Sequence, residues 1–301
     1  MTSYDIYAYG VVASSTLYSI RGAFPGPEGY AEIDDVHRMT GGEATNSSIV
    51  LSGLGVRVKL DGNWLGATDA GRRTKAILDG YNIDTSSLPI APGCEGVEEV
   101  VFAAGDTRTI FGSYGRLLES GNWNRPQEKD IVAAQVVCVD PFFGEASALA
   151  AAIAAGAGIP AVTVDCRHDD ALLGDVAAVV ISRSYLQWQY PGEKLEDVFR
   201  QYRESTNGLV IFTSGDRPVW YGQTGRPVKH SEPYAVKAVD TSGAGDAFRA
   251  GVAYGFLRGW DHDRIVDFSG ALAAIVCTRS PGVLNSPCLD EVLAFMDRER
   301  D

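Results

Sequence analysis

The stretch VDTSGAGDAF (residues 239–248) joins a glycine-rich turn to a segment that looks like the start of a helix. Small residues at Gly243, Ala244 and Gly245 let backbone N–H groups converge on a ligand without side chains in the way. A helix that begins there adds a partial positive charge facing the same point. Asp246, in the first turn, places a carboxylate beside this predicted anion hole.

An anion hole with an adjacent carboxylate suits phosphoryl transfer. Preorganised N–H donors stabilise the charge on the transferred phosphate, and the carboxylate can accept the proton of an attacking hydroxyl. On spacing alone, a glycine-rich turn in which Asp246 merely caps a helix is an equal alternative, because such turns are common.

Composition narrows the class of protein. The 301 residues can bury a substantial core, and 45% hydrophobic with 22% charged residues is ordinary for a globular enzyme. A net charge of −13 argues against nucleic acid or an anionic membrane as the main partner. The five cysteines form no Cys-x-x-Cys pair, and no signal peptide or membrane-length apolar run is visible, so we expect a cytoplasmic protein without a zinc cluster.

The rest of the chain alternates strand-like and helix-like segments, which predicts a mainly parallel sheet covered on both faces. We expect a single α/β domain over residues 1–301. Two alternating segments, 97–102 and 107–111, flank a turn at 104–106, and short extended pieces between 17 and 36 are their expected partners. These four pieces predict a small β-sheet lid, inserted roughly within residues 14–40 and 95–113.

The string DTSGAGDAFRAG (residues 240–251) resembles the C-terminal signature of the ribokinase, or PfkB-type, family of carbohydrate and nucleoside kinases. A second stretch, TGGEATNSS (residues 40–48), followed by Leu54-Gly55, resembles the N-terminal Gly-Gly-x-x-x-Asn signature of the same family. Two signatures about 200 residues apart, in the right order, are more specific than either alone.

The resemblance implies a three-layer α/β/α ribokinase-like domain with a β lid over the substrate, ATP and Mg²⁺ as cofactors, and a sugar-like substrate. Asp246 would be the general base, and Gly243, Ala244 and Gly245 would form the anion hole with the N–H of Asp246 itself. The substrate would lie against Gly41, Gly42 and Asn46, and the nucleotide against Thr213 and Gly215 as well as Gly243 and Gly245. By the same resemblance, a monovalent cation such as K⁺ would be held by Asp240, Ser242, Gly282 and Ser286, and a homodimer would form through the lid.

The sequence departs from the family pattern at several positions. Ser15 stands where sugar kinases of the family usually carry an aspartate that binds substrate hydroxyls. Ser182 and Tyr185 replace both members of the Asn-x-x-Glu that helps to organise magnesium, and Gly270 replaces an asparagine often found near adenine. Arg108, on a predicted lid strand, could meet an acidic or phosphorylated substrate, although an ordinary ion pair with a carboxylate is the simpler expectation.

These departures leave three functions open. The first is a sugar or sugar-acid kinase, and the second is a nucleoside kinase of the same family. The third is a catalytically weak ligand-binding protein, which the replacements at Ser15, Ser182 and Tyr185 support and the intact run from Gly243 to Asp246 opposes.

Overall fold

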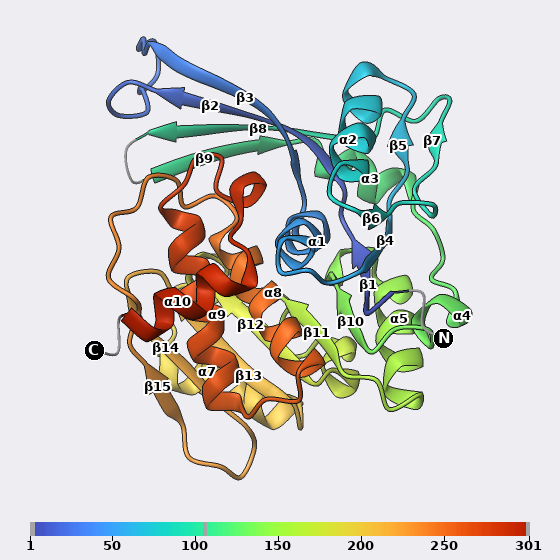
Figure 1. Ribbon diagram of the computed structural model, residues 1–301, viewed down its shortest axis with the longest axis vertical. Helices are drawn as coiled ribbons and strands as arrows, with labels where there is room; N and C mark the ends of the chain where they lie inside the picture. The colour runs from blue at the N-terminus through green and yellow to red at the C-terminus, as the bar shows by residue number, and fades with distance from the viewer. Residues whose placement is uncertain (1–3, 105–106, 299–301) are drawn as a thin grey trace.

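A nine-stranded sheet forms the centre of the molecule, and the computed structural model describes residues 4–104 and 107–298 of the chain (Figure 1). Its strand order is β15-β14-β13-β12-β11-β10-β1-β4-β6. All neighbouring strands from β13 to β6 run parallel, whereas β14 and β15 are antiparallel at one edge. The strands are β1 (Ile6–Gly10), β4 (Val58–Gly62), β6 (Ile83–Asp84), β10 (Val136–Val139), β11 (Ala161–Val164), β12 (Ala178–Ser182), β13 (Leu209–Ser214), β14 (Arg217–Gly222) and β15 (Lys229–Ser231).

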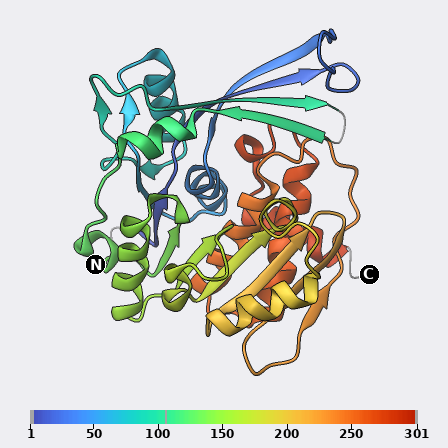
Figure 2. The same cartoon turned by 180° about the vertical axis from the view of Figure 1, so that it is seen from behind.

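Alternate side chains of each parallel strand enter two separate cores. In β1, Ile6 and Ala8 pack into one core, while Tyr7 and Tyr9 pack into the other. The first core is shared with α1 (Glu43–Gly53), α8 (Ala244–Leu257), α9 (His262–Cys277) and α10 (Leu289–Arg298). The second core lies on the opposite face, with α3 (Tyr114–Ser120), α4 (Glu128–Ile131), α5 (Glu145–Gly156), α6 (Arg183–Gln189) and α7 (Leu195–Ser205), as the view from behind shows (Figure 2). The expected three-layer, mainly parallel fold is confirmed.

A four-stranded sheet crosses one end of the main body (Figure 1). Its order is β3-β2-β8-β9, with β2 (Ala13–Ile20), β3 (Ile33–Gly41), β8 (Val97–Ala104) and β9 (Thr107–Gly112). We call this sheet the lid. Leu17, Met39 and Val101 pack on one of its faces with Leu284 of the main body, which fixes that face as the inner one.

Some details differ from expectation. The short extended pieces expected between residues 17 and 36 are instead parts of two long strands, β2 and β3, and the glycines and prolines lie in the loop between them. The predicted turn at 104–106 lies partly outside the described residues. The hairpin of β14 and β15 was not anticipated. A separate pair of short strands, β5 (Leu65–Gly66) and β7 (Ile90–Ala91), accompanies α2 (Asp69–Asp79), and three 3₁₀ turns, η1 (Pro141–Phe143), η2 (Ala171–Asp175) and η3 (Val283–Asn285), complete the elements.

The strand order reverses between β1 and β10, since the chain builds outward from β1 to β4 and from β10 to β13 on opposite sides. In parallel α/β sheets, ligands bind outside the carboxyl ends of strands at such a point. Gly10 ends β1 and Asp140 follows β10 at this place. The topology therefore predicts a ligand site at this edge of the sheet, beneath the lid.

Candidate active site

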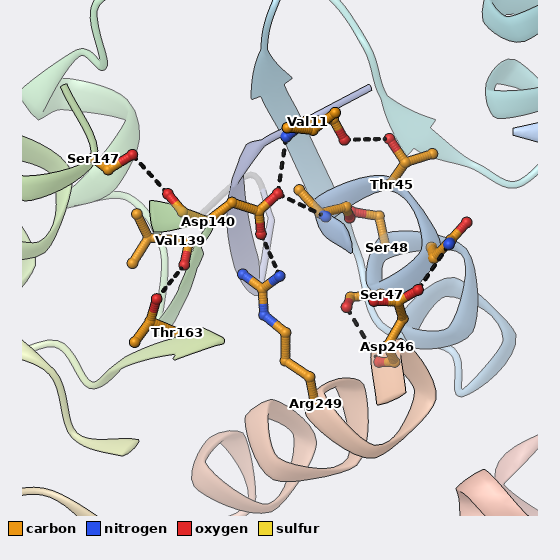
Figure 3. Close-up of polar contacts among 12 residues, drawn as sticks. Val11, Thr45, Ser47, Ser48, Val139, Asp140, Ser147, Thr163, Asp246 and Arg249 are labelled. Atoms are coloured by element: carbon orange, nitrogen blue, oxygen red, sulfur yellow. Dashed lines mark hydrogen bonds and ion pairs between the residues drawn. The ribbon is translucent and has the colours of Figure 1, made fainter. Parts of the chain in front are cut away.

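Asp140 connects three elements at the point where the strand order reverses. Its Oδ2 accepts hydrogen bonds from the N–H of Val11 at 2.8 Å and from the N–H of Ala44 at 3.0 Å (Figure 3). Its Oδ1 pairs with Arg249, whose side chain is fully buried. One carboxylate thus fixes the end of β1, the start of α1 and the middle of α8 relative to one another.

Asp246 lies in the first turn of α8, and α1 holds it from the side. Asn46 Nδ2 donates to Asp246 Oδ2 at 2.7 Å, and Ser47 Oγ donates to the Asp246 carbonyl at 3.2 Å (Figure 3). Burial raises the pKa of Asp246 to about 7, while the Asn46 hydrogen bond and the charge of Arg249 oppose the rise. A carboxylate poised near neutral pH can take a proton and release it, as a general base must. The two family-like signatures, 200 residues apart in sequence, therefore meet through Asn46 and Asp246.

The turn before α8 has the geometry of an anion-binding N-terminus. Gly243 is the N-cap residue in the left-handed region, with φ 78°, and a Cβ there would lie 2.1 Å from Val283 Cγ2. No side chain caps this end of the helix. The N–H of Ala244 makes a long contact of 3.3 Å with the Thr241 carbonyl, and the first bond of helical type runs from Ala247 to Gly243. In the described part of the chain, no carbonyl accepts from the N–H groups of Gly245 or Asp246.

Gly41 and Gly42 form the corner between β3 and α1, and both need to be glycine. A Cβ at position 41 would lie 1.9 Å from Glu99 Oε1, and one at position 42 would lie 2.2 Å from the Val11 carbonyl. Gly42 also has φ 91° and ψ 141°, a conformation that side chains disfavour. This close approach sets the start of α1, and hence Asn46, beside Asp246.

Ser15 lies in β2 on the inner face of the lid. It is paired in register with Met39 on one side and Glu99 on the other, and its side chain is 2% exposed. Ser15 Oγ has no hydrogen-bond partner among the described residues. The lid therefore presents an unsatisfied hydroxyl to the space above the α1 corner.

The expected nucleotide residues lie further along the same sheet edge. Thr213 is near the end of β13, and Gly215 begins the turn to β14 with φ 66°. Thr213 is paired with Ser182, which ends β12. Ser182 is not free for a metal, because its Oγ donates to Asp165 Oδ2 at 2.8 Å and accepts from the N–H of Tyr185 at the start of α6. Within residues 4–104 and 107–298, no cluster of three or more acidic, histidine or cysteine side chains could hold a metal.

Three of the four residues expected at a monovalent cation meet around Asp240. Its Oδ1 accepts from the N–H of Ser242 at 2.8 Å, and its Oδ2 accepts from the N–H of Gly282 at 3.4 Å. Ser242 Oγ is buried without a partner among the described residues. Ser286 lies apart, with its Oγ against Gly53 of α1.

Arg108 reaches from the lid to the turn before α8. Its Nη1 donates to the Thr241 carbonyl at 2.8 Å and contacts Thr241 Oγ1 at 3.3 Å. The expected carboxylate partner is thus wrong, and the partner is a backbone carbonyl. This hydrogen bond joins the lid to the segment that carries the anion hole.

Sequence reasoning missed several residues of the site. Asp140, Arg249, Glu43 and Glu99 were not anticipated, although two signals were available. Asp140 follows an entirely apolar strand, and Arg249 interrupts an apolar helix three residues after Asp246. A charge placed among apolar residues at a strand or helix end calls for a buried partner.

Comparison with known proteins agrees with this architecture. The ribokinase of Arabidopsis thaliana, solved with ribose and ATP, superposes with a TM-score of 0.81 at 17% identity and covers 97% of this chain and 98% of its own. A nucleoside kinase of Methanocaldococcus jannaschii, an archaeal member of the ribokinase family, gives a TM-score of 0.79 at 18% identity over 99% of both chains. These similarities establish the ribokinase-like fold.

The family follows from sequence. Residues 10–287 match the model of the pfkB family of carbohydrate kinases, and the chain belongs to this family. An ATP-dependent ribose-1-phosphate kinase of Halopiger xanaduensis is 25% identical over 292 residues, covering 92% of this chain and 93% of the relative. The protein is therefore an enzyme, a carbohydrate kinase in the broad sense that includes nucleoside kinases. None of the helices in the described part of the chain is both long and apolar enough to cross a membrane.

Proposed function

We propose that the protein transfers the γ-phosphate of ATP to a hydroxyl of a small sugar-like substrate, with Asp246 as general base. The observation that carries the proposal is the Asp246 carboxylate, held by Asn46 at the mouth of an uncapped helix N-terminus. Asp246 accepts the hydroxyl proton as the oxygen bonds to phosphorus, and the bond to the leaving ADP breaks. A pKa of about 7 suits this step near neutral pH.

The N–H groups at the start of α8 are the donors for the transferred phosphate. Those of Gly245 and Asp246 are not engaged by carbonyls of the described chain, and that of Ala244 is only weakly engaged. With Gly243 they make a concave set of donors at the positive end of a helix dipole. Donors fixed before the reaction stabilise transition-state charge without reorganisation.

ATP would extend from this turn toward Thr213 and Gly215 at the carboxyl edge of the sheet. Mg²⁺ neutralises phosphate charge when bound with ATP. Because Ser182 is committed to Asp165 and to the start of α6, we propose that the nucleotide phosphates hold the metal. This arrangement requires few protein carboxylates at the metal.

A monovalent cation such as K⁺ would bind beside Asp240, Ser242 and Gly282, behind the anion hole, with Ser286 as a more distant candidate. The buried, unpartnered Ser242 Oγ supports the proposal. Potassium should raise the rate above that in a large organic cation of equal ionic strength. Equal rates in the two salts would contradict a cation site at this position.

We further propose that residues 1–301 work as one unit in which two copies meet through their lids. The outer lid face carries an aromatic cluster of Tyr18, Phe24, Phe102 and Phe111, and Phe111 is 55% exposed. Exposed apolar clusters of this kind mark interfaces. Light scattering should report a dimer that Phe111→Asp converts to a monomer, and a monomeric wild type would contradict it.

The decisive test of the function is ADP release by the purified protein, with ATP and a panel of sugars, sugar acids and nucleosides. Turnover with a sugar supports the proposal, and turnover with nucleosides alone would assign the nucleoside-kinase alternative. Silence across the whole panel, with ATP still bound, would identify a ligand-binding protein instead.

A further inference from the structure

We propose that Ser15, Glu99, Tyr114 and Glu43 form a substrate subsite that selects neutral, hydroxyl-rich sugars and rejects sugars carrying a carboxylate or phosphate there. The inference rests on the proposed kinase function and adds the class of substrate. Ser15 stands where sugar kinases of the family usually carry an aspartate, and we assign the role of that aspartate to Glu99 and Glu43. The argument begins with the lid.

Strand register puts Glu99 and Ser15 side by side. In the parallel pair of β2 and β8, Ser15 is aligned with Glu99 and Leu17 with Val101. Aligned residues on neighbouring strands point to the same face, and Leu17 and Val101 are on the inner face. Ser15 and Glu99 therefore both face the main body, and the buried Ser15 Oγ has no partner among the described residues. An unsatisfied buried hydroxyl is costly unless a ligand completes its hydrogen bonds.

Glu99 extends across the lid to the corner that begins α1. Its Oε1 lies so close to Gly41 that a Cβ there would be 1.9 Å away. Its Oε2 accepts a hydrogen bond from the Tyr114 hydroxyl at 2.5 Å. The side chain is therefore anchored at one oxygen, while the other lies over the Gly41-Gly42 corner.

Glu43 supplies a carboxyl group from the first turn of α1, and its surroundings favour the neutral acid. Its Oε2 is buried without a hydrogen-bond partner among the described residues. Burial, with the nearby charges of Asp140 and Asp246, raises the pKa of Glu43 well above its usual range. The pKa of Tyr114 is also raised, by burial and by the charges of Glu99, Glu43 and Asp246. These four groups thus lie close together, next to the proposed general base.

Glu99 supplies the negative charge of this subsite, and Arg249, the buried cation near Glu43, is already paired with Asp140. Arg108 is on the inner lid face, but it donates to Thr241, and Arg38 donates to Thr16 on the outer face. No metal-binding cluster is present within the described ranges. Carboxylates accept hydrogen bonds from sugar hydroxyls, whereas a second anion meets like-charge repulsion in a partly buried site. The subsite therefore fits a sugar through its hydroxyl donors.

The test compares Glu99→Gln with Glu98→Gln, since Glu98 is the adjacent residue of β8 and is exposed on the other face. Ribose and fructose serve as neutral probes, and ribose 5-phosphate and gluconate as anionic ones. We expect wild type to favour a neutral sugar in kcat/KM by at least about tenfold. Glu99→Gln should shrink this ratio about tenfold, mainly through KM, because the amide removes the repelling charge. Glu98→Gln should keep the wild-type ratio.

A second variant guards against misfolding of the first. Ser15→Ala should raise KM for the neutral sugar by roughly two- to tenfold with kcat unchanged, as expected for one lost hydrogen bond. Equal ratios in Glu99→Gln and Glu98→Gln, or a wild-type preference for an anionic sugar, would overturn the inference while ADP release still supported the kinase. If no sugar released ADP, the kinase proposal would fail. Calorimetric binding of the same sugars without ATP would then decide, with tighter neutral binding in wild type supporting the subsite and its absence overturning it.

Discussion

At the scale of single residues, burial sets the working state of Asp246. The carboxylate is desolvated at the start of α8, and the Asn46 hydrogen bond only partly offsets this effect. Below it, the buried pair of Asp140 and Arg249 holds the two helices in place. A buried pair of this kind is weak evidence of stability but good evidence of position, since removing one partner leaves an uncompensated charge.

The raised pKa of Asp246 predicts how activity and stability depend on pH. Activity should rise with pH and level off above an apparent pKa of about 7, because only the ionised carboxylate accepts a proton. Stability should move the other way, because the unfolded pKa is about 4 and the folded state takes up the proton between the two values. The contribution of Asp246 is fully present below about pH 4 and is lost as pH rises through about 7.

Profiles of kcat/KM and of the urea midpoint against pH check this prediction. Asp246→Asn should remove the part of the stability change that falls between about pH 4 and about pH 7. Suppose that kcat/KM is flat through neutral pH and that the urea midpoint of the variant depends on pH as in wild type. The pKa of Asp246 would then not be raised.

At the scale of elements, the corner between β3 and α1 positions Asn46 beside Asp246. Gly42 combines a positive φ with close contact to the Val11 carbonyl, so both backbone conformation and space exclude a side chain. Gly55 is a matched control, with φ 82° and no atom within 4 Å of the position that a Cβ would take.

Gly42→Ala should therefore destabilise the fold more than Gly55→Ala. The control loses about 1 kcal/mol for its left-handed backbone, and Gly42→Ala should lose at least about 3 kcal/mol because a clash with main chain is added. Urea unfolding measures both. Equal losses in the two variants would mean that the corner has room to relax.

At the scale of the whole molecule, two of the contacts between lid and main body involve residues 241–284. Leu17, Met39 and Val101 pack against Leu284, and Arg108 bonds to the Thr241 carbonyl. The second link joins the lid to the turn that would hold the transferred phosphate. Lid position and anion-hole geometry are thus coupled by one exposed side chain.

Removing that link should loosen the lid without unfolding the protein. We expect Arg108→Ala to raise KM for the sugar several-fold, with the free energy of unfolding changed by no more than about 0.5 kcal/mol, since the side chain is exposed. Arg21→Ala, just after β2 of the lid, removes an exposed side chain that is paired with Asp34; it is the control and should keep the wild-type KM. Identical KM values in both variants would show that the Arg108 contact has no part in binding.

The sequence predicts the layers and the two signatures because periodicity and glycine-rich turns are local signals. It cannot predict the pairing of Asp140 with Arg249, since the two residues are 109 positions apart and nothing in either segment identifies the other. The sequence alone also does not show on which face of the lid Glu99 lies. Only the register of β8 with β2 shows that it faces the main body beside Ser15, whereas Glu98 faces away.

The most direct test of the account is ADP release by Asp246→Asn with the best sugar of the panel, beside ATP binding measured by calorimetry. The account predicts a fall in kcat of roughly 10²- to 10⁴-fold with ATP affinity retained, because a general base is removed from an intact nucleotide site. A variant that keeps most of the wild-type turnover would contradict the assignment of Asp246 as the base.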